Sequence, residues 1–189
     1  MIRTYASSIS QCTVIEFGAA AGLPSLVALS LGAKMVVATD YPSPSVIENL
    51  SRNLANHSLS LPRSPSTSFR VISHVWSDER SLSDIMQANN GESFDVALAA
   101  ECLWRHELHS DLAASLHRVL RVGGRALITF SHHIPGREAH DLQFFEIAES
   151  IDLRVASKSS VLAPHMWSDK SVDIFLYELE KIASTTCSI

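Results

Sequence analysis

The chain has few cysteines, no unbroken long apolar run and no excess of basic residues. Its three cysteines, Cys12, Cys102 and Cys187, are too few and too scattered for a disulfide framework, which fits a reducing compartment. The longest apolar stretch, from Val14 to Leu31, is interrupted by glutamate and glycine and is too broken to span a membrane. The first residues lack the apolar core of a signal peptide. We therefore expect a cytoplasmic protein with no membrane partner.

Positive charge is also scarce, because 15 Lys and Arg face 20 Asp and Glu, for a formal net charge of -5. A partner with a phosphate backbone needs clustered Lys and Arg, so nucleic acid is disfavoured as the main ligand. With 189 residues, of which 46% are hydrophobic, the chain is long enough for one domain with a substantial core and short for two. We expect a single domain over residues 1–189 that acts as a monomer.

Two kinds of catalytic site lack their full set of residues. His106 and His109 have the i, i+3 spacing of one helical face, but no matching cysteine or carboxylate set completes a metal site, so we expect no metal. No Ser-His-Asp pattern stands out, and Cys102 lies in a mostly apolar stretch where packing is favoured over a nucleophilic role.

Short apolar runs alternate with segments of helical periodicity. The last two runs leave little room for a helix between them and are expected to pair as an antiparallel, hairpin-like edge, with residues 159–170 irregular. Right-handed crossovers make the first five strands parallel. The result is an α/β fold with a seven-stranded, mostly parallel sheet, an antiparallel C-terminal strand and helices on both faces. The expected strands are 13–17, 35–40, 69–76, 94–100, 125–130, 153–157 and 172–179, and the expected helices are 24–31, 45–55, 81–88, 107–120 and 138–150.

The stretch 13–40 contains a buried strand, a small-residue turn, a helix and a second strand that ends on an acid, an order typical of nucleotide-type binding units. In a dinucleotide fingerprint two further glycines follow the first, but Ala20 and Leu23 stand at those positions and hinder close approach to a pyrophosphate.

Residues 58–68 are polar, contain prolines and are expected to form a loop.

Two acids favour a different ligand. Glu16, two residues before Gly18, would repel a pyrophosphate but can attract the cationic amino group of a methionine moiety, directly or through water. Asp40 ends the second strand, where a carboxylate can accept both hydroxyls of a ribose. A further glycine, Gly22, follows four residues after the first. The pattern predicts S-adenosylmethionine, and the alternative is a packing turn that binds no ligand.

Five motifs in order carry a resemblance to a known family: EFGAAAGLPS, VVATDYPSPSVIENLSRN, HVW, AAECLW and GGRALITFSHH. From about Thr13 onward, the chain resembles the seven-strand lysine methyltransferases of methyltransferase family 16, and within them the fungal elongation factor methyltransferase branch, historically labelled nicotinamide N-methyltransferase. The resemblance implies a Rossmann-like class I methyltransferase fold and S-adenosylmethionine as cofactor. It also implies methylation of a protein amine, at the N-terminus and a nearby lysine of translation elongation factor 1-alpha.

The resemblance also assigns individual cofactor contacts. Trp76, in the HVW motif, matches an adenine-side aromatic, and a tryptophan at a strand end offers the apolar platform that an adenine face needs; ordinary packing is the alternative. Ala100 matches a contact just before the acidic motif, and three small residues after the first strand match the cofactor loop. Together the pattern and the resemblance give the expected cofactor-binding residues, which are Glu16, Gly18, Ala19, Ala20, Gly22, Asp40, Tyr41, Trp76 and Ala100.

The chain departs from the family at two places. The family has Asp-Cys-Leu-Trp where this chain has Glu101-Cys102-Leu103-Trp104, and the additional methylene can shift the carboxylate by about a bond length. Relatives also carry a longer region before the first strand, with another cofactor-contacting tryptophan, and residues 1–12 contain none. We expect a truncated N-terminal region, whether as an incompletely predicted gene, a natural short form or a paralogue with impaired activity.

Methyl transfer from a sulfonium to an amine requires in-line alignment and a deprotonated amine, with no covalent nucleophile. Glu101 is the candidate residue to orient the amine, or alternatively a helix-start acid bound to backbone amides. Trp104 is the candidate wall of the amine channel, with core packing as the alternative. One histidine of Ser131-His132-His133 can accept a proton or shape the substrate cleft, unless the segment is simply a solvated loop.

Three functions remain open from the sequence. The first is a protein-amine methyltransferase. The second is a small-molecule N-methyltransferase acting on a nicotinamide-like compound. The third is a catalytically silent cofactor-binding or scaffold protein, which the short N-terminus and Glu101 suggest.

Overall fold

A computed structural model describes residues 9–60, 68–164 and 171–184. Most of the N-terminal segment, the middle of the expected 58–68 loop and the last part of the expected 159–170 irregular segment lie outside these ranges. The described part of the chain forms the elements β1 (Thr13–Phe17), α2 (Leu23–Ser30), β2 (Met35–Asp40), α3 (Pro44–Ser60), β3 (Ser68–Ser73), α4 (Glu79–Ala88), β4 (Phe94–Ala100), the 3-10 helix η2 (His106–Leu108), α5 (His109–Val119), β5 (Leu120–Phe130), α6 (Glu138–Glu149), β6 (Leu153–Pro164) and β7 (Ser171–Lys181).

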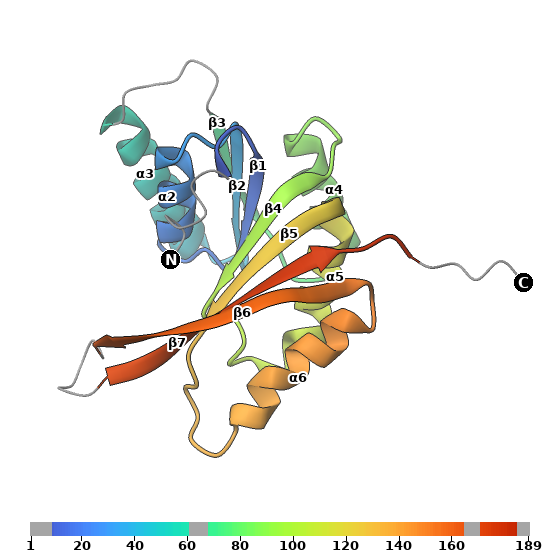
Figure 1. The fold of residues 1–189 in the computed structure, drawn as a ribbon. Helices are drawn as coiled ribbons and strands as arrows, with labels where there is room; N and C mark the ends of the chain where they lie inside the picture. Colours follow the sequence, from blue (N-terminus) through green and yellow to red (C-terminus); the bar gives the residue numbers. More distant parts are fainter. Residues whose placement is uncertain (1–8, 61–67, 165–170, 185–189) are drawn as a thin grey trace, which may run out of the picture.

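The strands form one sheet in the order β3-β2-β1-β4-β5-β7-β6 (Figure 1). The first five are parallel to one another, and β7 is antiparallel to both β5 and β6. The expected α/β fold, with its mostly parallel seven-stranded sheet, is therefore confirmed. The carboxyl ends of β1, β2 and β4 meet at one edge, as parallel strands require.

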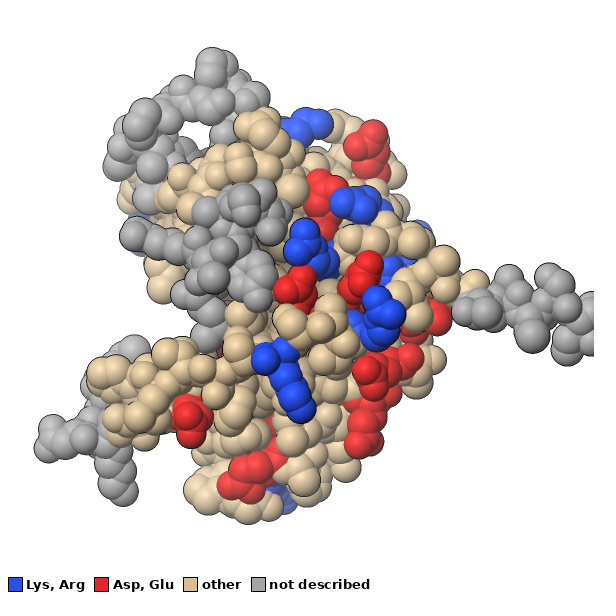
Figure 2. All heavy atoms as spheres, viewed as in Figure 1, with Lys and Arg blue, Asp and Glu red and all other residues tan. Residues whose placement is uncertain are grey.

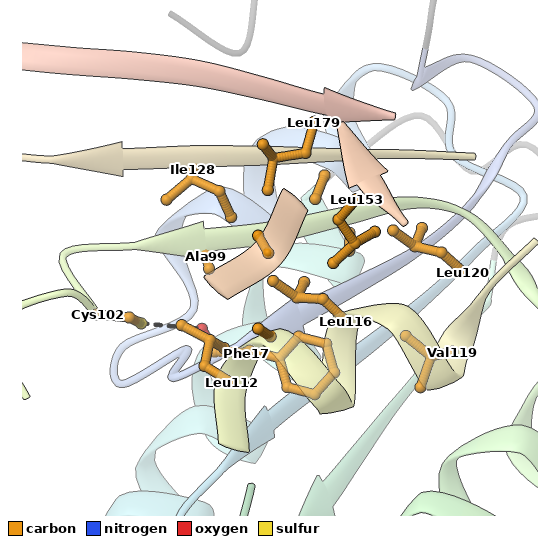
Figure 3. Close-up of a cluster of buried hydrophobic side chains, with 14 of the residues drawn as sticks. Phe17, Ala99, Cys102, Leu112, Leu116, Val119, Leu120, Ile128, Leu153 and Leu179 are labelled. Carbon is orange, nitrogen blue, oxygen red and sulfur yellow. Dashed lines mark hydrogen bonds between the residues drawn. The ribbon is translucent and has the colours of Figure 1, made fainter. Parts of the chain in front are cut away.

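Helices cover both faces of the sheet because the buried strands carry apolar residues on both sides. In β1, Ile15 and Phe17 join a core cluster with residues of α4, α5 and α6, while Val14 joins residues of α2 and α3 in the second cluster. Figure 3 shows the first cluster, where Phe17 packs near Leu112 of α5. Since side chains alternate along a strand, Glu16 points to the α2 side with Val14.

Several expected boundaries were wrong. Helix α3 continues to Ser60 instead of ending at Ala55, so residues 58–60 are helical and not part of the expected loop. Strand β3 ends at Ser73, so Trp76 lies beyond it, in a turn where Asp78 N–H bonds to the Val75 carbonyl at 3.0 Å. Strand β5 begins at Leu120, earlier than the expected start at Arg125. The Gly123-Gly124 pair, which was expected to precede the strand, lies inside it, where the register with β4 shifts. Strand β6 extends to Pro164, since the polar residues expected to be irregular pair with β7 along its length.

The pairing of β6 with β7 continues past the end of β5. The last partner of β5 is Phe175, opposite Phe130, whereas β6 pairs with β7 as far as Ser171. On the face shown in Figure 2, basic and acidic side chains are interspersed. Ion pairs between described side chains include Arg121 with Asp95 at 2.7 Å. Among the described helices, none combines the length and apolar character needed to cross a membrane.

Candidate functional site

The turn after β1 depends on residues with left-handed backbone conformations. Gly18, Ala20 and Gly22 have φ values of +64°, +47° and +80°. A Cβ at Gly18 would lie 2.7 Å from the Cys102 sulfur, and one at Gly22 would lie 2.6 Å from a methyl of Leu50, so neither position accommodates a side chain without movement. The glycines that the sequence singled out are therefore required by both conformation and space.

Asp40, at the end of β2, is bound to the turn. The Ala20 N–H donates to Asp40 Oδ2 at 2.7 Å, and the Tyr41 N–H donates to Asp40 Oδ1 at 2.7 Å. Ala19 is buried and its N–H donates to the Thr39 carbonyl at 2.9 Å. The structure thus brings the acid and the small-residue turn together, with the Tyr41 side chain exposed beside them.

Glu16 is buried under the turn, with only 1% of its surface exposed. Its Oε2 accepts hydrogen bonds from the Ser25 hydroxyl and from the Ser25 N–H, the latter at 2.9 Å, in the first turn of α2. Burial raises the pKa of Glu16 to about 7, and the nearby negative charge of Asp40 acts in the same direction. Sequence reasoning missed Ser25, although a serine directly after Pro24 at the start of a helix was a usable signal.

Trp76 lies beside the turn after β1. Its ring carbon Cζ2 is 3.8 Å from the Cβ position at Gly18, and its side chain is partly buried against the core. Trp76 is therefore next to the expected cofactor turn. It was expected at the end of a strand, but it lies in the turn that follows β3.

The turn that carries Trp76 is anchored by a polar network that the sequence did not reveal. The buried His74 ring bonds to Ser81 at 2.8 Å and to Ser115 at 3.3 Å, and the Ser77 N–H donates to the same Ser115 hydroxyl at 2.7 Å. Burial lowers the pKa of His74 to about 4, so the ring is neutral at physiological pH. The sequence feature that could have indicated this network is His74, the histidine of the HVW motif.

Glu101 lies directly after β4 in a left-handed conformation, with φ of +55°. Its carboxylate accepts from the Ser131 N–H at 3.1 Å and hydrogen-bonds to His133 Nε2 at 2.7 Å. The amide it binds belongs to the loop after β5, so the alternative of a helix-start acid is not what the structure shows. The sequence named Glu101 and His133 separately, and the structure brings them together.

Trp104 is 50% exposed, which excludes core packing, and Arg105 lies 5.3 Å from its ring centroid. Ala100, the last residue of β4, pairs with Thr129 of β5, one residue before Glu101. The exposed Trp104 ring is suited to a cationic group.

The two histidines considered for a metal site have other partners. His106 Nε2 bonds to Asp141 Oδ1 at 2.6 Å, and His109 Nε2 bonds to the Leu103 carbonyl at 2.8 Å. Asp141 also bonds to His132 Nδ1 at 2.7 Å. Within the described ranges, no group of three or more metal-ligating side chains has suitable geometry.

Cys102 is packed at the edge of the first core cluster and hydrogen-bonds to the Phe17 carbonyl at 3.5 Å (Figure 3). Burial raises the pKa of its thiol to about 12, and the charges of Glu16 and Asp40 add to the effect. A thiol with so high a pKa is not a nucleophile, which confirms the expected packing role.

The fold is shared with solved methyltransferase structures. A putative RNA methyltransferase of Pyrococcus horikoshii aligns with a TM-score of 0.66 at 13% identity, covering 96% of this chain and 81% of that one. A TehB-like SAM-dependent methyltransferase of Corynebacterium glutamicum aligns with a TM-score of 0.60 at 19% identity, covering 93% of this chain and 86% of that one. At these identities the likeness shows the fold alone.

Sequence comparison gives the family. The protein N-terminal and lysine N-methyltransferase efm7 of Neurospora crassa is 37% identical over 142 residues, which are 72% of this chain and 50% of that protein. The Schizosaccharomyces pombe protein of the same name is 32% identical, over 72% of this chain and 53% of that protein. The chain thus spans about half the length of these relatives. The family described as lysine methyltransferase matches residues 2–151, and the chain belongs to this family.

Proposed function

We propose that the protein binds S-adenosylmethionine at the turn after β1 and transfers its methyl group to an amine of a protein. Membership in a lysine methyltransferase family implies this methyl donor. One observation carries the proposal: the position of a Cβ at Gly18 is 2.7 Å from the Cys102 sulfur, and Cys102 directly follows Glu101. The proposed cofactor turn and the proposed amine-binding acid are therefore neighbours in space.

The residues around the turn fit the cofactor. Asp40 supplies a partly exposed carboxylate for ribose hydroxyls, Trp76 supplies an aromatic surface for the adenine, and the acid at Glu16 contributes negative potential beneath a cationic ligand. We further propose contacts from the turn and the neighbouring strand ends, namely Gly18, Ala19, Ala20, Gly22, Tyr41 and Ala100.

Bound S-adenosylmethionine supplies an electrophilic methyl group, and the protein has to orient and deprotonate the amine. Glu101 presents its carboxylate at the surface, with 42% of its side chain exposed, where it can accept a hydrogen bond from a lysine or N-terminal ammonium. We propose that the exposed ring of Trp104, three residues further along the chain, forms an aromatic wall of the amine site, to which a cation is attracted.

The exposure of both proposed substrate residues favours a protein substrate over an enclosed small molecule. The relatives are named for protein N-terminal and lysine methylation, and the resemblance of the motifs points to elongation factor 1-alpha. We therefore propose that this factor is the partner. We also propose that the chain acts as a single domain and a monomer in the cytoplasm, as its length and cysteine content predict.

The test incubates the protein with radiolabelled S-adenosylmethionine and an extract of cells that lack it, with purified elongation factor 1-alpha in parallel. We expect a labelled band at the size of the factor. In Asp40→Ala, which loses a charged hydrogen-bond acceptor, cofactor affinity should fall about 10- to 100-fold by calorimetry. Asp84→Ala, an exposed acid on α4, is the matched control and should bind normally.

Other outcomes separate the alternatives. Labelling of nicotinamide without labelling of any protein would support the small-molecule reaction. Cofactor binding without any labelled product would support the scaffold function. If the wild type binds no S-adenosylmethionine and Asp40→Ala changes nothing, both methyltransferase proposals are wrong.

A further inference from the structure

We propose that His133 acts through Glu101 as a proton-relay residue that keeps the incoming amine neutral, and thereby sets the pH dependence of methyl transfer. This inference rests on the function proposed above. It goes further by assigning the route of the proton, which the motifs do not specify, to a histidine on a different loop.

The geometry places the imidazole directly on the proposed amine-binding acid. His133 Nε2 is 2.7 Å from Glu101 Oε2, and the Ser131 hydroxyl is 3.2 Å from the same oxygen. The side chain of His133 is 49% exposed and that of Glu101 is 42% exposed, so both reach solvent. The pair thus has one end available to a substrate and the other end available to water.

The loop that carries His133 is held in place from its other side. His132, its neighbour, bonds through Nδ1 to Asp141 Oδ2 at 2.7 Å, and its ring lies 5.0 Å from the Phe175 ring centroid. Asp141 is buried on α6 and also bonds to His106 at 2.6 Å. A loop anchored in this way positions His133 against Glu101 without requiring substrate to order it.

The backbone of Glu101 is also held in place. Its N–H donates to the Thr129 carbonyl at 2.7 Å, and its left-handed φ of +55° turns the chain directly after β4. A residue other than glycine or asparagine in this conformation is uncommon, and such strained positions cluster at functional sites.

The proton is accounted for at every step. The hydrogen bond to the ionised Glu101 places the ring hydrogen of His133 on Nε2. Exchange with water moves that hydrogen to Nδ1 and frees Nε2. The substrate ammonium then gives a proton to the Glu101 carboxylate, which passes it to Nε2, and the exposed Nδ1–H releases a proton to water, which restores the starting tautomer. The freed amine lone pair forms the new C–N bond, and the electrons of the breaking methyl–sulfur bond go to sulfur. Imidazole is the side-chain base that most often takes up a proton in enzymes.

Other ionisable groups lie on the elements that carry the pair or pack beside them. On the loop after β5 and on helix α6 these are His132, Glu138 and Asp141, and on the segment after β4 they are Arg105 and His106. The charges of Glu16 and Asp40 act on Cys102, as does that of Glu101. His133 contacts the Glu101 carboxylate directly, which makes that histidine the residue to vary.

The test measures single-turnover methyl transfer to purified elongation factor 1-alpha between pH 6 and 9.5, in the wild type and His133→Gln. We expect a loss of about 10-fold or more at pH 7 that shrinks steadily towards pH 9.5, because a growing fraction of the lysine amine is neutral without the relay as the pH approaches its ordinary pKa of about 10.4. A merely structural defect would lower the rate equally at every pH. His117→Gln, at the opposite end of α5, is the matched control and should follow the wild type.

A second readout needs no cofactor. The carboxyl ¹³C resonance of Glu101 is followed by NMR as the pH is varied, in the wild type and in His133→Gln. We expect the two pH profiles of this resonance to differ, because the imidazole contacts the carboxylate directly. A rate ratio that does not change with pH, or a Glu101 resonance that ignores the substitution, overturns the relay alone. A wild type that transfers no methyl group at any pH overturns the proposed function with it.

Discussion

The carboxyl edge of the sheet has two halves that are built differently. The cofactor half, around the turn after β1, is fixed by backbone: the carboxylates of Glu16 and Asp40 accept from backbone N–H groups of residues close by. The substrate half, after β4 and β5, is held by side-chain contacts, such as Glu101 with His133, between loops that are distant in sequence. Glu16 and Ala19 of the cofactor half are buried, whereas Glu101 and His133 of the substrate half are almost half exposed.

This difference predicts different consequences of substitution. In the cofactor half the same groups support folding and ligand binding, so a change there should affect both. In the substrate half the exposed pair contributes little to stability, because a solvent-exposed ion pair is worth about 0–1 kcal/mol. A change there should alter the rate and leave the fold and the cofactor affinity unchanged.

The largest effect is expected for Gly18→Ala. Its Cβ would overlap the Cys102 sulfur, and alanine is disfavoured at φ of +64°. We expect a loss of roughly 2–4 kcal/mol in the free energy of unfolding, by urea titration, and no measurable cofactor binding. Gly136→Ala is the matched control, because Gly136 has φ of +79° but nothing within 4 Å of its Cβ position. It should lose only about 1 kcal/mol. Equal losses in the two variants would show that packing at Gly18 is unimportant.

Glu101→Gln is expected to have the next largest effect, on the rate only. It removes the negative charge that orients the ammonium and accepts its proton, so single-turnover methyl transfer should slow about 100-fold. Cofactor affinity by calorimetry and the urea midpoint should stay at the wild-type values. Glu92→Gln, an exposed glutamate in the turn before β4, serves as the control. A fall in stability as large as that of Gly18→Ala would contradict the distinction between the two halves.

The smallest effect concerns pH and Glu16. The folded protein keeps a proton on Glu16 up to its pKa of about 7, whereas an unfolded chain releases it near the ordinary value for glutamate. Between these values the folded state binds more protons, so this group makes the free energy of unfolding fall as the pH rises. The slope reaches at most about 1.4 kcal/mol per pH unit. Urea titrations at pH 5, 6 and 7 should show a flatter dependence for Glu16→Gln than for the wild type. An unchanged slope would mean that Glu16 is ionised throughout.

The sequence predicted the cofactor half well, because its features are local. The boundaries of β1 and β4 and the two glycines of the turn follow from short apolar runs and small residues. Trp76 was expected at the end of the third strand, but that strand ends at Ser73 and Trp76 lies beyond it. The resemblance of the motifs supplied the family, which the matched relatives confirm.

Other features were not visible in the sequence. The extension of β6 to Pro164 has no apolar alternation to mark it and depends on pairing with β7. The bond between Glu16 and Ser25 depends on how α2 lies over β1, and the anchoring of the Trp76 turn depends on the approach of α5 to α4. Periodicity describes each element separately and carries no information on such pairs.

By itself, then, the sequence determined the order of elements, the conformation of the turn after β1 and the acid at the end of β2. These depend on side-chain alternation, on glycine's access to positive φ and on strand ends, all of which act over a few residues. Only the tertiary structure decided that Glu101 meets His133, that Asp141 joins His106 to His132, and that Glu16 is buried. Those contacts require β4 and β5 to be neighbours and α6 to pack beside them, because side chains that are remote in sequence interact only when the sheet order brings them together.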